Sequence, residues 1–165
     1  MSPATSFNHF PSKQDLATAL VERYAAADAG VLADISARAE RLSADPLQQL
    51  LLFVGLLADE VEEGIRVAPG CLFASFCYER ELIDEETRTV IADSMLLWRT
   101  SIRELLDRVV AHHPPRLSVD LDEVADQATI VVEGSYVLVR ALGDATIARA
   151  QLSQLRNYLE LLFAP

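Results

Sequence analysis

The pattern that most restricts the fold lies at the carboxyl-terminal end of the sequence. Apolar side chains recur there at alternating intervals of four and three residues, which places them on one face of an α-helix. This stripe consists of Ala148, Leu152, Leu155, Leu159 and Leu162. Similar spacing recurs along the chain, and no apolar–polar alternation of the kind that a half-buried strand requires is bounded by turn residues. The sequence therefore predicts an all-α fold.

The helix expected before this one, over residues 120–142, has two apolar stripes. One stripe is Val124, Ala128, Val131, Ser135, Leu138 and Leu142, and the other is Ile130, Gly134, Val137 and Ala141. Their centres lie about 110° apart on the helix, so the helix is expected to pack between two partners. Small residues in the second stripe permit close approach of another helix.

We expect the last two helices to pair with the same helices of a second subunit. This would form a four-helix bundle with twofold symmetry, and hence a homodimer. The residues predicted at the dimer interface are Val131, Gly134, Leu138, Leu152, Leu155, Leu159 and Leu162.

Turn and capping residues divide the rest of the chain into helices. Residues 12–15 resemble a capping box, and the helix that follows is expected to reach about Leu42, with a bend or an end at Gly30. The segment 47–57 is apolar nearly all round, so it should be central and buried. Asp84 is expected to cap a long helix. The apolar stripe of that helix is Ile91, Met95, Trp98, Ile102, Leu105 and Val109.

Net charge argues against DNA binding by this chain alone. The formal net charge is −11 at pH 7. Phosphate contacts supply most of the affinity of DNA-binding proteins, and they require Lys and Arg on one face. Within residues 1–24, Lys13 and Arg23 are balanced by Asp15 and Glu22.

Apolar runs in the sequence are short. The longest uncharged one covers residues 46–58, fewer than the roughly 20 residues that a membrane-spanning helix needs. The amino terminus has no basic region followed by an apolar run, so no secretory signal is expected. We predict a cytoplasmic protein with no membrane partner.

A short motif near the amino terminus carries a family resemblance. Residues 7–16 follow the pattern Phe-x-His-Phe-x-Ser-Lys-x-x-Leu. This pattern resembles the junction that closes the helix-turn-helix of TetR-family transcriptional regulators, where the recognition helix ends and the connecting helix begins. The helix order and lengths expected for the rest of the chain are also similar to those of that family. By this resemblance Thr5, Phe7 and His9 would lie near DNA, and Lys13 would meet a phosphate.

The motif departs from the family pattern in two side chains. Ser6 stands where the family has a large apolar residue, and Phe7 replaces the usual Tyr. In addition, Met1 begins inside the motif, so the first two helices of the DNA-binding head are expected to be absent. The chain is then either a fragment of a longer repressor or a longer repressor with a wrongly assigned start codon, and we favour this explanation. The alternative is a natural form that lacks the DNA-binding head.

The resemblance implies two parts in the chain. Residues 1–27 would be a remnant of the DNA-binding head, and residues 28–165 would be the effector-binding and dimerisation domain. Operator DNA would be bound only if the missing amino-terminal helices are present. Effector binding would change the spacing of two DNA-binding heads and so lower operator affinity.

The same resemblance implies an effector pocket between the helices of the body. The aromatic residues predicted to line it are Phe53, Phe73, Phe76, Trp98 and Tyr136. Ordinary core packing is the alternative role for each of them. Tyr78, Arg99 and Tyr136 are the candidates for its polar groups, and a small, largely apolar effector is expected.

The sequence contains little that predicts catalysis or metal binding. His112 and His113 have Val109 and Val110 three residues before them, which argues against the Glu-x-x-His pattern of di-iron bundles. No phosphate-binding loop, nucleophile elbow or zinc spacing occurs, so no cofactor, metal or enzymatic activity is predicted. The preferred function is a TetR-type repressor body that binds an effector and dimerises. The alternatives are a headless helical module that acts by pairing with other regulators, and a helical-bundle enzyme.

Overall fold

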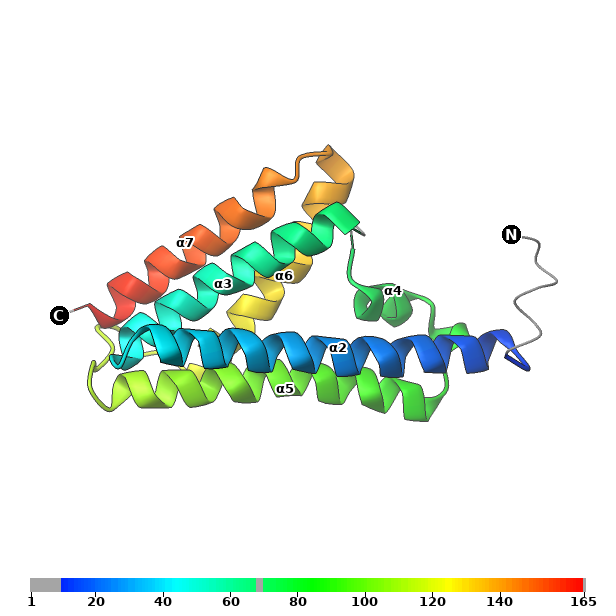
Figure 1. Ribbon diagram of the computed structural model, residues 1–165, viewed down its shortest axis with the longest axis horizontal. Coiled ribbons are helices and arrows are strands. Elements are labelled where there is room, and N and C mark those ends of the chain that lie inside the picture. Colours follow the sequence, from blue (N-terminus) through cyan, green and yellow to red (C-terminus); the bar gives the residue numbers. More distant parts are fainter. Residues whose placement is uncertain (1–9, 68–69, 165) are drawn as a thin grey trace.

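The computed structural model describes residues 10–67 and 70–164 of the chain, and within these ranges all regular structure is helical. The elements are α2 (Lys13–Leu42), α3 (Pro46–Val67), α4 (Leu72–Tyr78), the 3₁₀ helix η1 (Arg80–Leu82), α5 (Glu85–Val110), α6 (Leu121–Leu142) and α7 (Thr146–Phe163). Figure 1 shows the long helices α2 and α5 side by side and running in the same direction, with α3, α6 and α7 rising from one end of the pair. The predicted all-α fold is confirmed. None of the helices among the described residues is long and apolar enough to cross a membrane.

Helix α2 begins at a cap that the sequence predicted. Ser12 Oγ accepts a hydrogen bond from the backbone N–H of Asp15 at 3.1 Å and donates one to Asp15 Oδ2 at 2.6 Å. The helix then continues through Gly30 without interruption, so the expected bend or end at that residue is wrong. Val21 and Ile35, on either side of Gly30, are fully buried, and their packing outweighs the low helix propensity of one glycine. The predicted boundary between residues 27 and 28 therefore falls inside one continuous helix.

The core is centred on α3, as the apolar run over residues 47–57 predicted. Leu50, Leu51 and Phe53 are almost completely buried there, and α3 packs against α2, α5 and α7. A second, smaller cluster joins the amino-terminal part of α2 to α4 and the start of α5, through Val21, Phe73 and other side chains. The two clusters stabilise opposite ends of the pair formed by α2 and α5.

The leucine stripe of α7 lies inside the protomer. Leu152 is fully buried, and Leu155, Leu159 and Leu162 are buried almost as completely. Helix α7 packs them against α3 and α6 of its own chain. The assignment of these four leucines to a dimer interface is therefore corrected, because at 0–6% exposure they offer almost no area to a partner.

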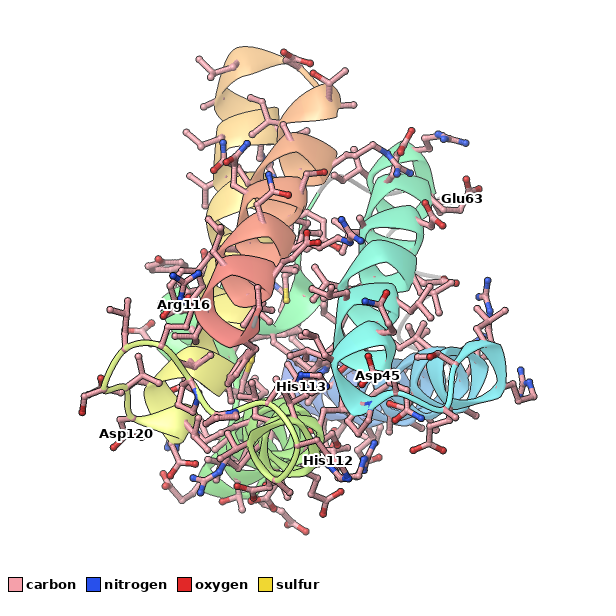
Figure 2. All side chains as sticks on the ribbon, turned by 90° about the vertical axis from the view of Figure 1, so that its left-hand side faces the viewer. Asp45, Glu63, His112, His113, Arg116 and Asp120 are labelled. Carbon is pink, nitrogen blue, oxygen red and sulfur yellow. The ribbon has the colours of Figure 1, made fainter. Side chains whose placement is uncertain are left out.

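Helix α5 begins at the cap that the sequence predicted. Asp84 accepts a hydrogen bond from the backbone N–H of Thr87 at 2.8 Å and so begins α5. At the far end of α5, His113 Nε2 lies 2.9 Å from Oδ1 of Asp45, which precedes α3 (Figure 2). His112 Nδ1 lies 3.1 Å from the carbonyl oxygen of Arg108. Both histidines therefore interact with neighbouring groups at the carboxyl-terminal end of α5.

Two glycines in this framework should respond in opposite ways to substitution by alanine. Gly30 is exposed within α2 and a Cβ there would meet nothing within 4 Å, so Gly30→Ala is expected to raise the free energy of unfolding by about 0.5–1 kcal/mol. Gly143 ends α6 with φ +69°, so Gly143→Ala should lower that free energy by about 1 kcal/mol. Urea denaturation followed by helical circular dichroism measures both changes. A loss of stability in Gly30→Ala would contradict the account of α2 given above.

Candidate functional site

A cavity of about 420 Å³ lies within the body of the molecule. Side chains of α2, α3, α5 and α6 line it, together with Cys71 and Phe73 at the start of α4. The apolar stripe of α5 passes along this cavity. Ile91 and Ile102 of that stripe are buried, whereas Met95 and Trp98 between them are half-buried and line the cavity. Part of the apolar surface at the middle of α5 thus faces the cavity.

Three of the five aromatic residues predicted for an effector pocket line this cavity. These are Phe73, Trp98 and Tyr136. Phe53 and Phe76 do not line it. Phe53 is fully buried behind Trp98, with ring centroids 6.3 Å apart and an edge-on arrangement, and Phe76 belongs to the smaller core cluster. Their alternative role in core packing is the one that the structure shows.

Of the three predicted polar groups, only Tyr136 faces the cavity. The side chain of Tyr78 is on the surface, 87% exposed. Arg99 instead forms a two-pronged ion pair with Asp126, with N–O distances of 2.7 and 2.6 Å. The cavity also has a lining aromatic that the sequence did not single out, Tyr24, whose ring packs edge-on against Phe73 at a centroid distance of 4.8 Å.

Two acidic side chains in the cavity wall were not predicted from the sequence. Asp28 extends from α2 and Glu133 from α6, and both are half-buried. Trp98 Nε1 donates a hydrogen bond to Asp28 Oδ2 at 2.6 Å. A pattern that could have identified them is present, because Asp28 is the only charged residue between Arg23 and Asp34, and Glu133 is the only one in residues 127–139.

Burial shifts the pKa values of the groups around the cavity. It raises the pKa of the Asp28 carboxyl, which the hydrogen bond from Trp98 opposes. Burial also raises the pKa of Glu133, and the nearby Asp28 charge adds to the rise while Cys71 opposes it. The pKa of Tyr136 is raised to about 12, mainly by burial. These shifts have a common cause, because an apolar wall disfavours any negative charge that it surrounds.

Two further acids line the cavity, and each has an arginine beside it. Glu60 lies 3.5 Å from the guanidinium of Arg38, and Glu63 lies 2.9 Å from that of Arg66. Figure 2 shows Glu63 on the side of α3 that faces away from α6 and α7. Glu60 and Glu63 are thus neutralised by surface cations, in contrast to Asp28 and Glu133.

An apolar surface follows the outer side of α6. It consists of the exposed residues Ile130, Gly134, Val137, Leu138, Ala141 and Leu142. The second predicted stripe of this helix is therefore open to solvent over its whole length. Of the residues predicted at the interface, Gly134 and Leu138 belong to this surface and Val131 is half-buried. On α7, Leu161 is exposed as well.

Four residues were predicted to contact DNA. Three of them, Thr5, Phe7 and His9, lie outside the described residues. Lys13 is exposed in the first turn of α2. Among residues 10–67 and 70–164, no group of three or more His, Cys, Asp and Glu side chains could hold a metal ion. Cys71 is buried and Cys77 is exposed, and both are free thiols.

Comparisons with known proteins agree on one family. Residues 46–155 match the model of the tetracyclin repressor-like C-terminal domain. A TetR-family regulator from Agrobacterium tumefaciens is 28% identical, with a TM-score of 0.73 over 99% of this chain and 82% of the other. A regulatory protein TetR from Rhodobacter sphaeroides is 20% identical, with a TM-score of 0.71 over 96% of this chain and 82% of the other. A TetR regulator from Legionella pneumophila is 20% identical, with a TM-score of 0.64 over 97% and 78%. No curated protein matches the sequence.

Proposed function

This chain belongs to the TetR family of transcriptional regulators, and from that premise we propose that its helical body binds a small effector in the cavity and pairs with a second copy through α6 and α7. Regulators of this family are dimers that bind small effectors and DNA, and they are not enzymes. The observation that carries the proposal is the cavity of about 420 Å³, which is of the size and apolar character typical of small-molecule sites.

The position of the cavity suggests how an effector would act. Side chains from α2 and α5 form one part of its wall, and side chains from α3 and α6 form another. Helix α2 is the first described helix of the chain, and it lies along α5 (Figure 1). An effector that binds more tightly to one arrangement of α2 relative to α3 and α6 would shift the population toward it. Through α2, the two DNA-binding heads of a repressor dimer would then change their spacing.

The body itself is proposed to add little to DNA affinity. The chain has a net charge of −11. In addition, many of its cationic side chains are already paired with acids of the same chain. The arginines in such pairs are Arg38, Arg66, Arg88, Arg99, Arg103, Arg108, Arg149 and Arg156. Because phosphate contacts need free cations on one face, operator binding is assigned to the helix-turn-helix motif, with Lys13 as one contact.

A cavity-filling variant tests effector binding. Gly64 lines the cavity, and a Cβ placed there would lie 3.6 Å from the hydroxyl oxygen of Tyr136. Gly64→Leu is therefore expected to extend a side chain into the space and to weaken binding of the neutral fluorescent probe N-phenyl-1-naphthylamine by about tenfold or more. The wild-type chain should bind the probe at one saturable site, measured by the rise in its emission.

Gly55→Leu provides the matched control for this experiment. Gly55 lies on the same helix, away from the cavity lining, and a Cβ there would meet nothing within 4 Å. Its variant should bind the probe as the wild type does. Equal binding by the Gly64→Leu and wild-type chains, or no saturable binding by the wild type, would contradict the proposed effector site.

A further inference from the structure

We propose that the cavity selects an organic cation with an apolar body, for which Asp28 and Glu133 supply the charge complement and the surrounding aromatic rings supply the contact surface. This inference rests on the proposed effector function, and it assigns the chemical class of the effector. The sequence favoured only a small, largely apolar molecule.

The first argument is the placement of two carboxyl groups in an otherwise apolar wall. Asp28 and Glu133 come from different helices, α2 and α6, and both line the cavity. Both side chains face the same space, and the charge of Asp28 adds to the burial that raises the pKa of Glu133. One ligand inside the cavity can therefore interact with both groups. A cation there would stabilise both ionised carboxylates and relieve their mutual repulsion.

The second argument is that neither carboxyl group has a cationic partner among the described side chains. Within the described part of the chain, Asp28 accepts a side-chain hydrogen bond only from Trp98, through Oδ2. Among the side chains that the structure describes, no arginine, lysine or histidine lines the cavity. The other two acids of the lining, Glu60 and Glu63, differ in this respect, because each lies beside an arginine. A half-buried carboxylate without a counter-ion costs free energy, and a ligand cation would offset that cost whereas a neutral or anionic ligand would not.

The third argument is the aromatic lining. Tyr24, Phe73, Trp98 and Tyr136 contribute rings to the cavity from four different elements. The negative face of an aromatic ring attracts a cation, most strongly where water is excluded, and rings of this kind recognise quaternary ammonium groups. Carboxylates and aromatic rings around one apolar space thus favour the same ligand class. A quaternary ammonium or phosphonium compound fits this combination, since it has no N–H donors that would need further acceptors.

The test compares three ligands that share one apolar body and differ in charge. They are biphenyl-4-ylmethyl-trimethylammonium, biphenyl-4-methanol and biphenyl-4-acetate, and calorimetric titration of the full chain measures their affinities. The cation is expected to bind about tenfold or more tightly than the alcohol, and the anion more weakly than the alcohol. In the double variant Asp28→Asn/Glu133→Gln the preference for the cation over the alcohol should fall to about threefold or less, because only the cation–π contribution remains.

A second double variant controls for the loss of two charges. Asp34→Asn/Glu123→Gln removes one acid from each of the same helices, at exposed positions outside the cavity lining, and should keep the cation preference. Unchanged affinity for the alcohol in Asp28→Asn/Glu133→Gln would show that the cavity is still folded. Equal affinities of the wild type for the cation and the alcohol would overturn the inference, as would a cation preference that is undiminished without Asp28 and Glu133. If the cation fails to bind while N-phenyl-1-naphthylamine binds, this inference is wrong and the effector cavity stands, whereas failure of both would also count against the proposed function.

Discussion

Replacing Leu152 with alanine is expected to lower the free energy of unfolding by about 2–5 kcal/mol. Leu152 lies in α7, has no exposed surface, and packs within the main core cluster of its own protomer. Removing most of its side chain leaves a cavity that the surrounding helices can fill only in part, since α7 is held between α3 and α6. Urea denaturation followed by helical circular dichroism should show the loss as an unfolding midpoint at a lower urea concentration.

Gln151→Ala is the matched control for Leu152→Ala. Gln151 is the preceding residue of the same helix and is exposed, so its replacement by another good helix former should change the free energy of unfolding by less than about 0.5 kcal/mol. A folded and fully stable Leu152→Ala chain that has only lost its partner would contradict the placement of Leu152 in the protomer core. In that case the dimer interface through Leu152 that the sequence predicted would be the correct one.

The stripe of α7 illustrates what helical periodicity can and cannot predict. The spacing of Leu152, Leu155, Leu159 and Leu162 identifies the buried face of the helix correctly. It does not identify what covers that face, because burial by a neighbouring helix and burial by a second subunit require the same pattern. The structure decides between them, since α3 of the same chain already covers the stripe. The outer stripe of α6, which includes Val137, is the one that its own chain leaves exposed.

At Gly30 the sequence interpretation gave too much weight to the low helix propensity of glycine. One glycine lowers helix stability by only about 1 kcal/mol relative to alanine. The buried residues Val21, Leu32 and Ile35 hold α2 against the rest of the molecule on either side of it. Tertiary packing therefore sets the length of α2, and packing partners distant in sequence are not visible in a local pattern.

The cavity was predictable in its location more than in its chemistry. Trp98 and Tyr136 were expected near an effector because of the helices on which they lie, and they do line the cavity. The sequence could not show that Phe53 packs in the core and does not line the cavity. A cavity forms where the side chains of facing helices do not meet, and this depends on three-dimensional packing. Asp28 and Glu133 were the more specific indication, as single acids within apolar segments. Such an acid must end beside a partner, beside water or beside a ligand.

Replacing Val137 with arginine is expected to convert the proposed dimer to a monomer at micromolar concentration. Val137 is 66% exposed at the middle of the apolar surface of α6, so the substitution leaves the core of the protomer intact. In an interface with twofold symmetry the change occurs twice, and two arginines would meet near the axis without a counter-ion. Gly134, one turn earlier, permits close helix approach, which makes the buried charges more costly. The dissociation constant should rise by about 100-fold or more, measured by sedimentation equilibrium.

Leu42→Arg separates this effect from a general effect of added charge. Leu42 is as exposed as Val137, at the carboxyl-terminal end of α2, and it lies outside the surface formed by α6 and α7. Its variant should remain as dimeric as the wild type, and both variants should keep the helical content and the unfolding cooperativity of a folded chain. A wild type that sediments as a monomer at micromolar concentration would refute pairing through α6. A dimer that survives Val137→Arg would mean that the subunits meet on another face, and that the exposed stripe of α6 needs a different partner.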